Sequence, residues 1–333
     1  MKIFLAGATG AIGERLVPLL RSGGHAVTGT TRSPSKAARL RASGTDAVVL
    51  DALDREAVIG AVVAAAPDVV VHQVTALATL RSLRKFDREF ALTNRLRTEG
   101  TEHLLAGARA VGARVFVAQS YTGWPNDPRG ARVQTEDDPL DPDPPPAMRA
   151  TLDAIRRLEA VVTGADGLTG IVLRYGSFYG PGTSISRESD GVRLARARKF
   201  PHVKEGAGDG EIVRLVRARK FPIVGDGAGV WSFIHIDDAA EATKLAIDRA
   251  VAGIYNITDD EPAEVSRWLP ELARAVGAPP PRRIPAWLAR LAIGAAGVAM
   301  MTRSRGSSNA KAKRVLGWEP RHPTWRAGFQ DLR

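Results

Sequence analysis

The chain has 333 residues, no cysteine and a formal net charge of +11 at pH 7. This length suits one large α/β domain with a smaller appended region. The missing cysteines exclude disulfides, thiolate nucleophiles and cysteine-type metal sites, and they fit a protein of the reducing cytoplasm.

The positive charge does not predict a nucleic-acid partner. Basic residues are mostly scattered arginines, and segment 191–222 alone holds nine Lys/Arg against three Asp/Glu, with only Phe200 and Phe221 between them as stacking platforms. The start of the chain lacks the pattern of a signal peptide. The most apolar run, 286–301, contains an arginine and is too short to span a membrane. We expect neither a nucleic-acid nor a membrane partner.

Short apolar runs alternate with helical patterns from the N-terminus to about residue 180. The predicted strands are 2–6, 25–32, 47–51, 67–74, 113–120 and one that begins the segment 169–182. The predicted helices are 14–21, 34–42, 54–65, 82–110 and 147–163. This alternation predicts an α/β fold of the Rossmann type, a doubly wound parallel sheet with helices on both faces.

Beyond residue 180 the alternation weakens. Segment 231–247 predicts a return to the main sheet and its covering helix, and the tail from 253 on predicts mostly helix. We predict an NADP-binding Rossmann domain made of 1–178 with 230–250. A smaller, mostly helical substrate-binding lid would consist of 179–229 with 251–333.

One internal repeat interrupts the second half of the chain. Segment 193–208 recurs as 214–229 with twelve of 16 positions identical, which indicates a local duplication whose first copy is the insert. Ile212, Leu215 and Val216 share one helical face. The repeat is either an amphipathic flap near the substrate entrance or a solvated surface insertion.

A glycine-rich turn follows the first predicted strand. Gly7, Gly10 and Gly13 form G-x-x-G-x-x-G and open a helix. Glycine allows the backbone to turn tightly and approach a pyrophosphate, and the helix N-terminus offers free N–H groups to it. We predict a dinucleotide site here, which also includes Thr9, Ala11 and Ile12.

The end of the second strand distinguishes between the two nicotinamide cofactors. An acidic residue there would bind a ribose 2′-hydroxyl, but the chain has Thr31, Arg32 and Ser33. Arginine suits a 2′-phosphate, so we predict NADPH. Asp51, with Ala52 after it, is placed to contact adenine, although Asp51 also fits the N-cap of the next helix.

These segments resemble the extended short-chain dehydrogenase/reductases, the NAD-dependent epimerase/dehydratase group, over nearly the whole chain. The matching segments are GATGAIG, VVHQVTA, FVAQS, LRYGSFYGPG, FIHIDDAA and the C-terminal AKRVLGWEPRHPTWRAGF. The resemblance implies further cofactor contacts from three parts of the chain. They are Gln73 and Val74, then Ser120, then Tyr175, Gly176, Ser177 and Phe178.

In that family a tyrosine exchanges a proton with the substrate oxygen, and a lysine four residues later lowers the tyrosine pKa and holds a ribose. Aligning the helix 147–163 on Glu159 places Thr151 at the tyrosine position and Ile155 at the lysine position. No tyrosine lies between Tyr121 and Tyr175, and no lysine lies between Lys85 and Lys199. The loss of the pair therefore does not depend on the alignment.

Two residues remain as candidates for the catalytic work, Ser120 to orient a carbonyl and Thr151 to hold a water. Tyr121 and Tyr179 are weaker alternatives. His72 and His235 lie at strand ends and are expected to be structural. The six histidines show no metal-ligand spacing, so we expect no metal.

We expect an NADPH-dependent ketoreductase that acts on a small-molecule ketone and takes its proton from water or from the substrate's own hydroxyl. Tailoring ketoreductases of aromatic polyketide pathways, in antibiotic biosynthesis, resemble this pattern. A non-catalytic NADP(H)-binding sensor or scaffold is the second reading, and a nucleotide-sugar epimerase or dehydratase is the third. The helices at 82–110 and 147–163 would form the interface of a homodimer. A monomer is the alternative.

Overall fold

A computed structural model describes residues 1–77, 83–187 and 209–332. Its main sheet has seven strands in the order β12-β7-β5-β4-β1-β2-β3, and all neighbouring pairs are parallel. The predicted Rossmann-type fold is confirmed. The strands are β1 (Lys2–Ala6), β2 (Ala26–Thr31), β3 (Asp46–Val49), β4 (Val69–His72), β5 (Val115–Tyr121), β7 (Thr169–Tyr175) and β12 (Gly253–Ile257).

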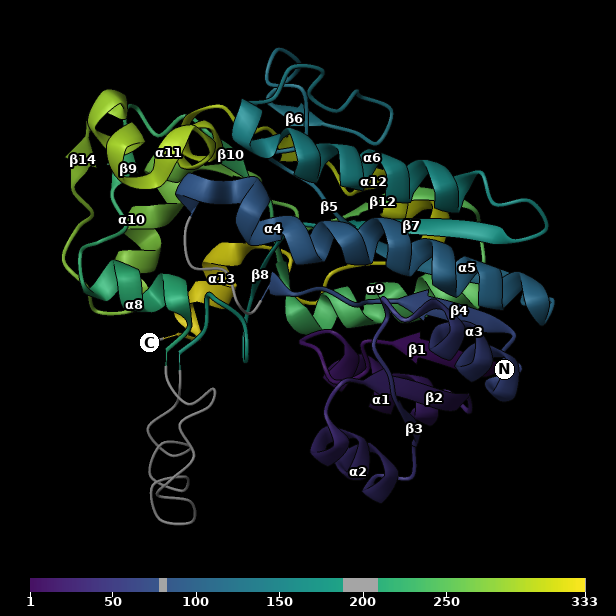
Figure 1. Cartoon of the computed structure of the whole chain (residues 1–333). Coiled ribbons are helices and arrows are strands. Elements are labelled where there is room, and N and C mark those ends of the chain that lie inside the picture. The colour runs from purple at the N-terminus through teal and green to yellow at the C-terminus, as the bar shows by residue number, and fades with distance from the viewer. Residues whose placement is uncertain (78–82, 188–208, 333) are drawn as a thin grey trace.

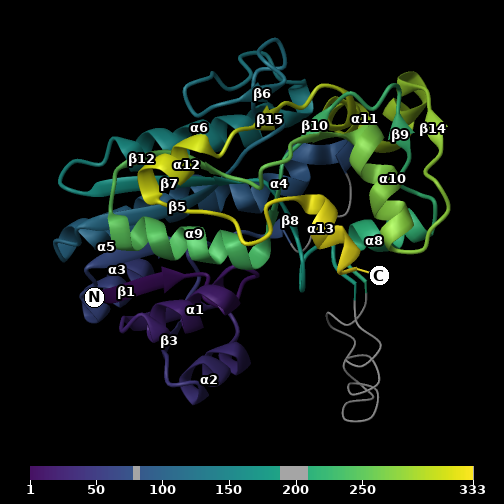
Figure 2. The same cartoon turned by 180° about the vertical axis from the view of Figure 1, so that it is seen from behind.

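Helices cover both faces of this sheet (Figures 1 and 2). One face carries α1 (Gly13–Ser22), α9 (Ile236–Arg249) and α12 (Ala310–Leu316). The other carries α3 (Arg55–Ala65), α5 (Thr101–Ala110) and α6 (Arg149–Thr163). The helix α4 (Phe86–Arg95) continues through a π-helical turn, Leu96–Gly100, directly into α5, and α2 (Pro34–Ala42) lies beside β2 and β3.

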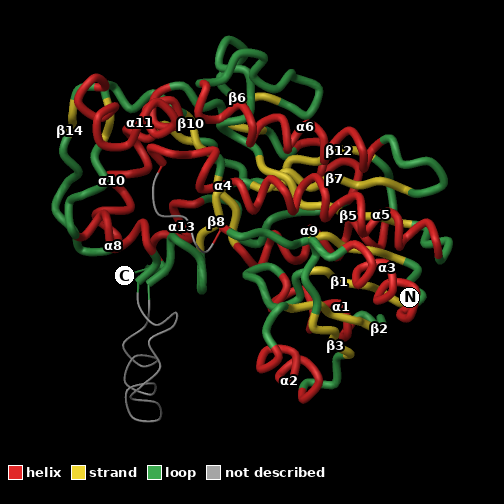
Figure 3. The backbone as a smooth tube through the Cα atoms, in the orientation of Figure 1, coloured by secondary structure: helices red, strands yellow, loops and turns green. Residues whose placement is uncertain are grey.

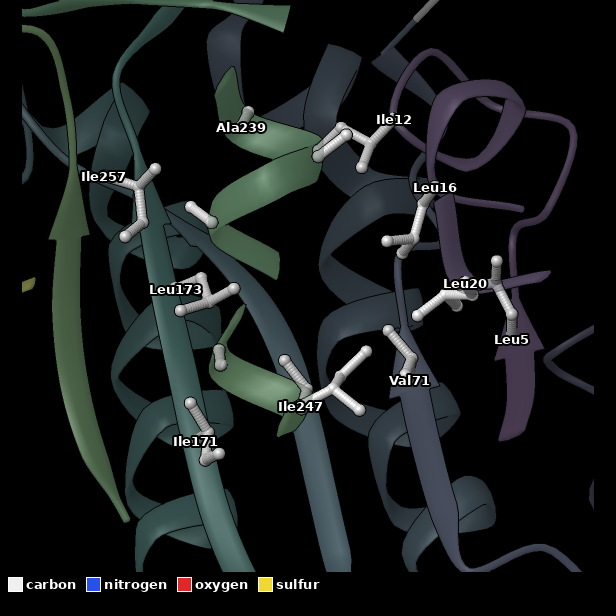
Figure 4. Close-up of a cluster of buried hydrophobic side chains, with 14 of the residues drawn as sticks. Leu5, Ile12, Leu16, Leu20, Val71, Ile171, Leu173, Ala239, Ile247 and Ile257 are labelled. Atoms are coloured by element: carbon white, nitrogen blue, oxygen red, sulfur yellow. The ribbon is translucent and has the colours of Figure 1, made fainter. Parts of the chain in front are cut away.

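Alternation along the strands divides the core between the two faces. Ile3 and Leu5 pack toward α1 and α9, whereas Phe4 and Ala6 pack toward the helices of the opposite face. Figure 4 shows the first cluster, in which Ile247 of α9 lies among side chains from the sheet and α1. Burial on both faces explains why these strands read as nearly continuous apolar runs.

The rest of the described chain forms a smaller region beside one end of the sheet (Figure 3). Its core holds an aromatic group in which Phe233 contacts Trp268, Trp325 and Phe329. The helices are α8 (Glu211–Arg217), α10 (Val265–Ala275), α11 (Ala286–Thr302) and α13 (Trp325–Gln330).

Short strands and single turns complete the described elements. The paired strands are β8 (Ser177–Tyr179) with β11 (Phe233–His235), β9 (Ile223–Val224) with β14 (Arg283–Ile284), β10 (Val230–Trp231) with β13 (Ala263–Glu264), and β6 (Val133–Gln134) with β15 (Gly306–Ser307). The 3₁₀ turns are η2 (Leu83–Lys85) and η4 (Pro146–Met148). Among the described residues, no helix is both long and apolar enough to cross a membrane.

Two sequence predictions about the sheet are wrong. Segment 231–247 supplies the covering helix α9, but its strand β11 pairs with β8 and not with the main sheet. The backbones before β8 and β11 approach each other closely, since a Cβ on Gly176 would lie 2.8 Å from the Ser232 carbonyl oxygen. The edge beside β7 is taken by β12, in a stretch that we predicted to be mostly helical. With only five residues, β12 is too short a pattern to distinguish from a helical tail in the sequence alone.

Only the second copy of the internal repeat lies within the described residues. The first copy, 193–208, lies outside the described residues. The second begins within α8, which buries Val213 and Val216, while Ile212 and Leu215 of the predicted face are half-buried. The flap remains a prediction.

Candidate cofactor and active site

The glycine turn joins β1 to α1 at the centre of the sheet. Gly7 has φ +92°, and a Cβ there would lie 2.8 Å from the Gln73 carbonyl oxygen. A Cβ on Gly13 would lie 2.3 Å from the Gly7 carbonyl oxygen, so the turn packs directly against the helix start. No described residue accepts a hydrogen bond from the N–H groups of Ala11, Ile12 or Gly13. These free donors at a helix N-terminus fit a dinucleotide pyrophosphate.

The strand order reverses at this turn. The chain builds β1, β2 and β3 to one side, then returns to place β4 on the other side of β1. In open α/β sheets a dinucleotide binds across this point, at the carboxyl ends of the strands. The adenine half would lie over β2 and β3, and the nicotinamide half over β4 and β5.

The residues predicted for the adenine half lie together at the end of β2. Thr31 accepts from the Thr9 hydroxyl at 2.9 Å, and Ser33 caps α2 by accepting from the Lys36 N–H. Arg32 is exposed, and no hydrogen bond or ion pair to another described residue holds its guanidinium. Lys36 is a second exposed cation in the first turn of α2. The sequence reasoning missed it, although RSPSK displays both cations.

Asp51 and Ala52 follow β3. Asp51 is exposed and accepts from the Leu53 N–H at 3.0 Å. The N-cap of α3 is Asp54 and not Asp51, so the capping interpretation of Asp51 is wrong. Ala52 is buried, and its carbonyl oxygen is 3.1 Å from His103 Nδ1.

The end of β4 is buried and polar. His72 Nε2 lies 3.1 Å from the Leu96 carbonyl oxygen, while Nδ1 accepts from the Val74 N–H at 3.2 Å. Burial lowers the pKa of His72 to about 4, so it is neutral at pH 7 and both ring nitrogens have partners. Gln73 donates to the Tyr175 hydroxyl at 3.1 Å, but its Oε1 is buried and has no partner among the described residues.

The four predicted residues that begin at the last residue of β7 make mostly structural contacts. The Tyr175 hydroxyl pairs with Thr243 at 2.7 Å, and Phe178 packs on the Tyr175 ring at 5.5 Å. Ser177 pairs with the Tyr121 hydroxyl at 3.1 Å. Gly176 lies against the Ser232 backbone.

None of the tyrosines resembles an acid tuned for neutral pH. The chain has four. Burial raises the pKa of Tyr121, Tyr179 and Tyr255, and it raises the pKa of Tyr175 to about 12. A tyrosine that donates a proton near pH 7 needs its pKa lowered.

Thr151 lies at the start of α6 with its hydroxyl already engaged. It donates to Asp87 Oδ1 at 2.6 Å and accepts from Asn94 Nδ2 at 3.0 Å, and its side chain is fully buried. Asp87 also accepts the N–H groups of Ala150 and Thr151, so it caps α6 from the neighbouring helix α4. Ile155 is likewise fully buried.

Ser120, on β5, belongs to a buried ionic network with Glu159 of α6 and Arg174 of β7. Its hydroxyl donates to Glu159 Oε1 at 2.8 Å. Arg174 donates to both oxygens of the same carboxylate, at 2.8 and 2.6 Å, and both charged side chains are about 5% exposed or little more. Glu159 lies eight residues beyond Thr151, about 12 Å along the helix axis. Among the described contacts the two hydroxyls have different partners, Glu159 for Ser120 and Asp87 with Asn94 for Thr151, and their catalytic roles remain predictions.

Three polar residues of the 86–100 helix were missed by the sequence reasoning. Asp87, Asn94 and Arg97 all face α6 or its network. Their spacing of seven and three residues places them on one helical face, which was the available signal.

Two histidines far apart in the sequence, His235 and His322, lie together in the structure, which their sequence spacing did not indicate. His235, Asp238 and His322 are the group of metal-ligand type found among the described residues. The two rings are stacked at 3.8 Å, and His322 Nδ1 is 3.0 Å from Asp238 Oδ2. Stacked rings direct their in-plane lone pairs side by side, which does not suit a tetrahedral metal site.

Comparison with known proteins identifies the group. A model of the NAD dependent epimerase/dehydratase family matches residues 3–258. The chain belongs to this family. Its glycine turn and parallel sheet are thus those of a nicotinamide-dependent family, which supports a nicotinamide cofactor for this epimerase/dehydratase relative.

Two curated relatives of this family member are reductases by name. It is 46% identical over 330 residues, 99% of each chain, to a 3-diazoavenalumate denitrifying reductase from a Streptomyces species. It is 26% identical over 280 residues, 83% of this chain and 74% of the relative, to a Stigmatella aurantiaca ketoreductase that acts on 4-hydroxy-2-methyl-3-oxo-4-farnesyl-3,4-dihydroquinoline-1-oxide.

Solved structures agree with the fold. The Thermus thermophilus UDP-glucose 4-epimerase with NAD has a TM-score of 0.68 and 24% identity, covering 100% of this chain and 97% of that one. The human epimerase family protein SDR39U1 with NADPH has a TM-score of 0.70 and 18% identity, covering 100% and 99%. The same fold thus accommodates either cofactor.

Glu159→Gln tests the buried network. We predict that it lowers the free energy of unfolding by about 3 kcal/mol, because Arg174 stays buried without a counter-charge. The double variant Glu159→Leu with Arg174→Met, which removes both charges, should lose much less. Urea unfolding followed by circular dichroism measures both, and a Glu159→Gln protein within about 0.5 kcal/mol of wild type would contradict a buried charged pair.

Proposed function

We propose that this protein is an NADPH-dependent reductase that transfers hydride to an aromatic diazo compound with release of dinitrogen. The observation that carries the proposal is the missing proton donor: α6 has Thr151 and Ile155 where the family has its tyrosine and lysine. The tyrosines elsewhere have raised pKa values. The relative that matches 99% of the chain is named a denitrifying reductase of a diazo compound.

The chemistry explains why no acid is needed. NADPH, when bound, supplies a hydride to the ring carbon that bears the diazonium group. A new C–H bond forms as the C–N bond breaks, and N₂ leaves with the electron pair of that bond. The arenediazonium cation and NADPH thus give the arene, N₂ and NADP⁺, with atoms and charge balanced and no proton consumed.

The residues of this chain then have binding and shielding roles. The free N–H groups of Ala11, Ile12 and Gly13 would bind the pyrophosphate, and Arg32 with Lys36 would bind the 2′-phosphate. Thr151 and Ile155, at the positions where the family has its tyrosine and lysine, are fully buried and carry no ionisable group. A site lining that excludes water would protect a hydride acceptor that water would otherwise attack.

Ketone reduction is the second candidate, because the relative that is 26% identical is named a ketoreductase. It requires one proton for each hydride. The described contacts leave water or the substrate's own hydroxyl to supply it, since the Ser120 hydroxyl donates to Glu159 and the Thr151 hydroxyl donates to Asp87.

A substrate comparison tests the proposal. The purified protein should oxidise NADPH with 3-diazoavenalumate and release one N₂ for each NADPH, measured by absorbance at 340 nm and by gas analysis. Aromatic polyketide ketones should react much more slowly. Fast turnover of ketones without any reaction of the diazo compound would favour the second candidate instead.

Arg32 tests the choice of cofactor. Arg32→Asp should lower the ratio of NADPH to NADH affinity by at least about tenfold, because a 2′-phosphate would face a carboxylate in place of a guanidinium. Arg39→Asp, at an exposed arginine of the helix α2 that follows Arg32, should leave the ratio unchanged. Fluorescence titration measures both affinities, and an unchanged ratio in Arg32→Asp would contradict the role of Arg32.

A further inference from the structure

Arg97 carries a buried guanidinium that has no partner among the residues that the structure describes. The residue is 6% exposed, and its Nη1 is buried with no hydrogen bond. No other described residue makes a hydrogen bond or an ion pair with this side chain. Burial lowers its pKa to about 10, so it stays charged at neutral pH. Native proteins rarely leave such a group unsatisfied, and a bound ligand or water normally accounts for it.

The charges of the described residues around Arg97 do not balance. Glu159 is the carboxylate that acts on it, and that carboxylate already accepts two hydrogen bonds from Arg174 and one from Ser120. His72, whose pKa Arg97 lowers further, is neutral. Two guanidinium groups therefore share one carboxylate, and one positive charge is left over.

Contacts on either side fix the height of Arg97 along α6. Asn94, three residues earlier, bonds to Thr151, and Glu102, five residues later, pairs with Arg157. Arg97 therefore faces the middle of α6 near Ile155, where the resemblance puts the family's lysine. The preceding carbonyl, of Leu96, is bonded to His72 at the carboxyl end of β4.

This place lies on the nicotinamide side of the cofactor site. His72 precedes Gln73, whose carbonyl oxygen touches Gly7 of the glycine turn. Because the adenine half is directed toward β2 and β3, the other half must extend over β4 and β5. Its ribose and phosphate oxygens are hydrogen-bond acceptors, and guanidinium groups bind such oxygens well.

We propose that Arg97 binds the oxygens of the nicotinamide nucleotide half of the cofactor, from the helix that neighbours α6. The inference rests on the proposed cofactor, NADPH. It does not depend on the identity of the hydride acceptor. In this arrangement Arg97 is a positioning residue that supplies, from a different helix, the cation that α6 lacks.

Binding measurements without any acceptor test this role. Arg97→Met should weaken NADPH binding at least tenfold, measured by isothermal titration, and Arg97→Lys should weaken it less. Neither variant should change by more than about twofold the binding of adenosine 2′,5′-bisphosphate, which has only the adenine half. Arg32→Ala serves as the control and should weaken both ligands. The ligand-free Arg97→Met protein should melt no lower than wild type, because it loses an unpaired buried charge.

Two results would overturn the proposal. If Arg97→Met binds NADPH within twofold of wild type, the guanidinium does not hold the cofactor, and a raised KM for the acceptor would assign it to the substrate. If both ligands weaken equally, the substitution has damaged the site as a whole. Should Arg97→Met fail to fold, the same comparison in Arg97→Lys decides. Inactivity toward diazo compounds leaves these binding results unaffected, so the two proposals fail separately.

Discussion

The site depends on the hydrogen bonds of the buried Glu159 carboxylate, which lies near the carboxyl ends of β5 and β7. The carboxylate joins three elements, because it lies on α6, is held from β7 by Arg174 and accepts a hydrogen bond from the Ser120 hydroxyl on β5. This arrangement fixes α6 against the sheet. It also commits the Ser120 hydroxyl to a hydrogen bond with Glu159, and no other carboxylate of the described chain pairs with Arg97. The assignment of the remaining side chains follows from these three consequences.

Features that depend on local sequence were predictable. The glycine turn lies within seven residues, and its strand–turn–helix context is visible in the order of residue types. The missing tyrosine and lysine could be established by counting alone, since neither residue type occurs anywhere near the helix. Arg32 likewise follows its strand directly. These predictions needed no knowledge of which helices touch.

Features that depend on helix crossings were not predictable. Ser120 ends the expected strand, but only the packing of α6 shows that its hydroxyl points to Glu159, about two helical turns from Thr151. The roles of three further residues become visible only from their packing against α6; these are Asp87, Asn94 and Arg97. The edge strand β12 was missed for a similar reason, because five residues become a strand only beside β7.

The proposed chemistry and the described contacts agree on one point: the hydroxyls of Ser120 and Thr151 already donate to carboxylates, and α6 carries no tyrosine. A diazonium carbon needs no proton donor, whereas a ketone needs one. The most direct measurement follows the hydrogen itself, with NADPH deuterated at both C4 positions in ordinary water. We predict that the product of 3-diazoavenalumate carries one deuterium at the carbon that lost nitrogen, and that unlabelled NADPH in D₂O gives none there. Deuterium arriving from D₂O, or none arriving from the cofactor, would contradict direct hydride transfer.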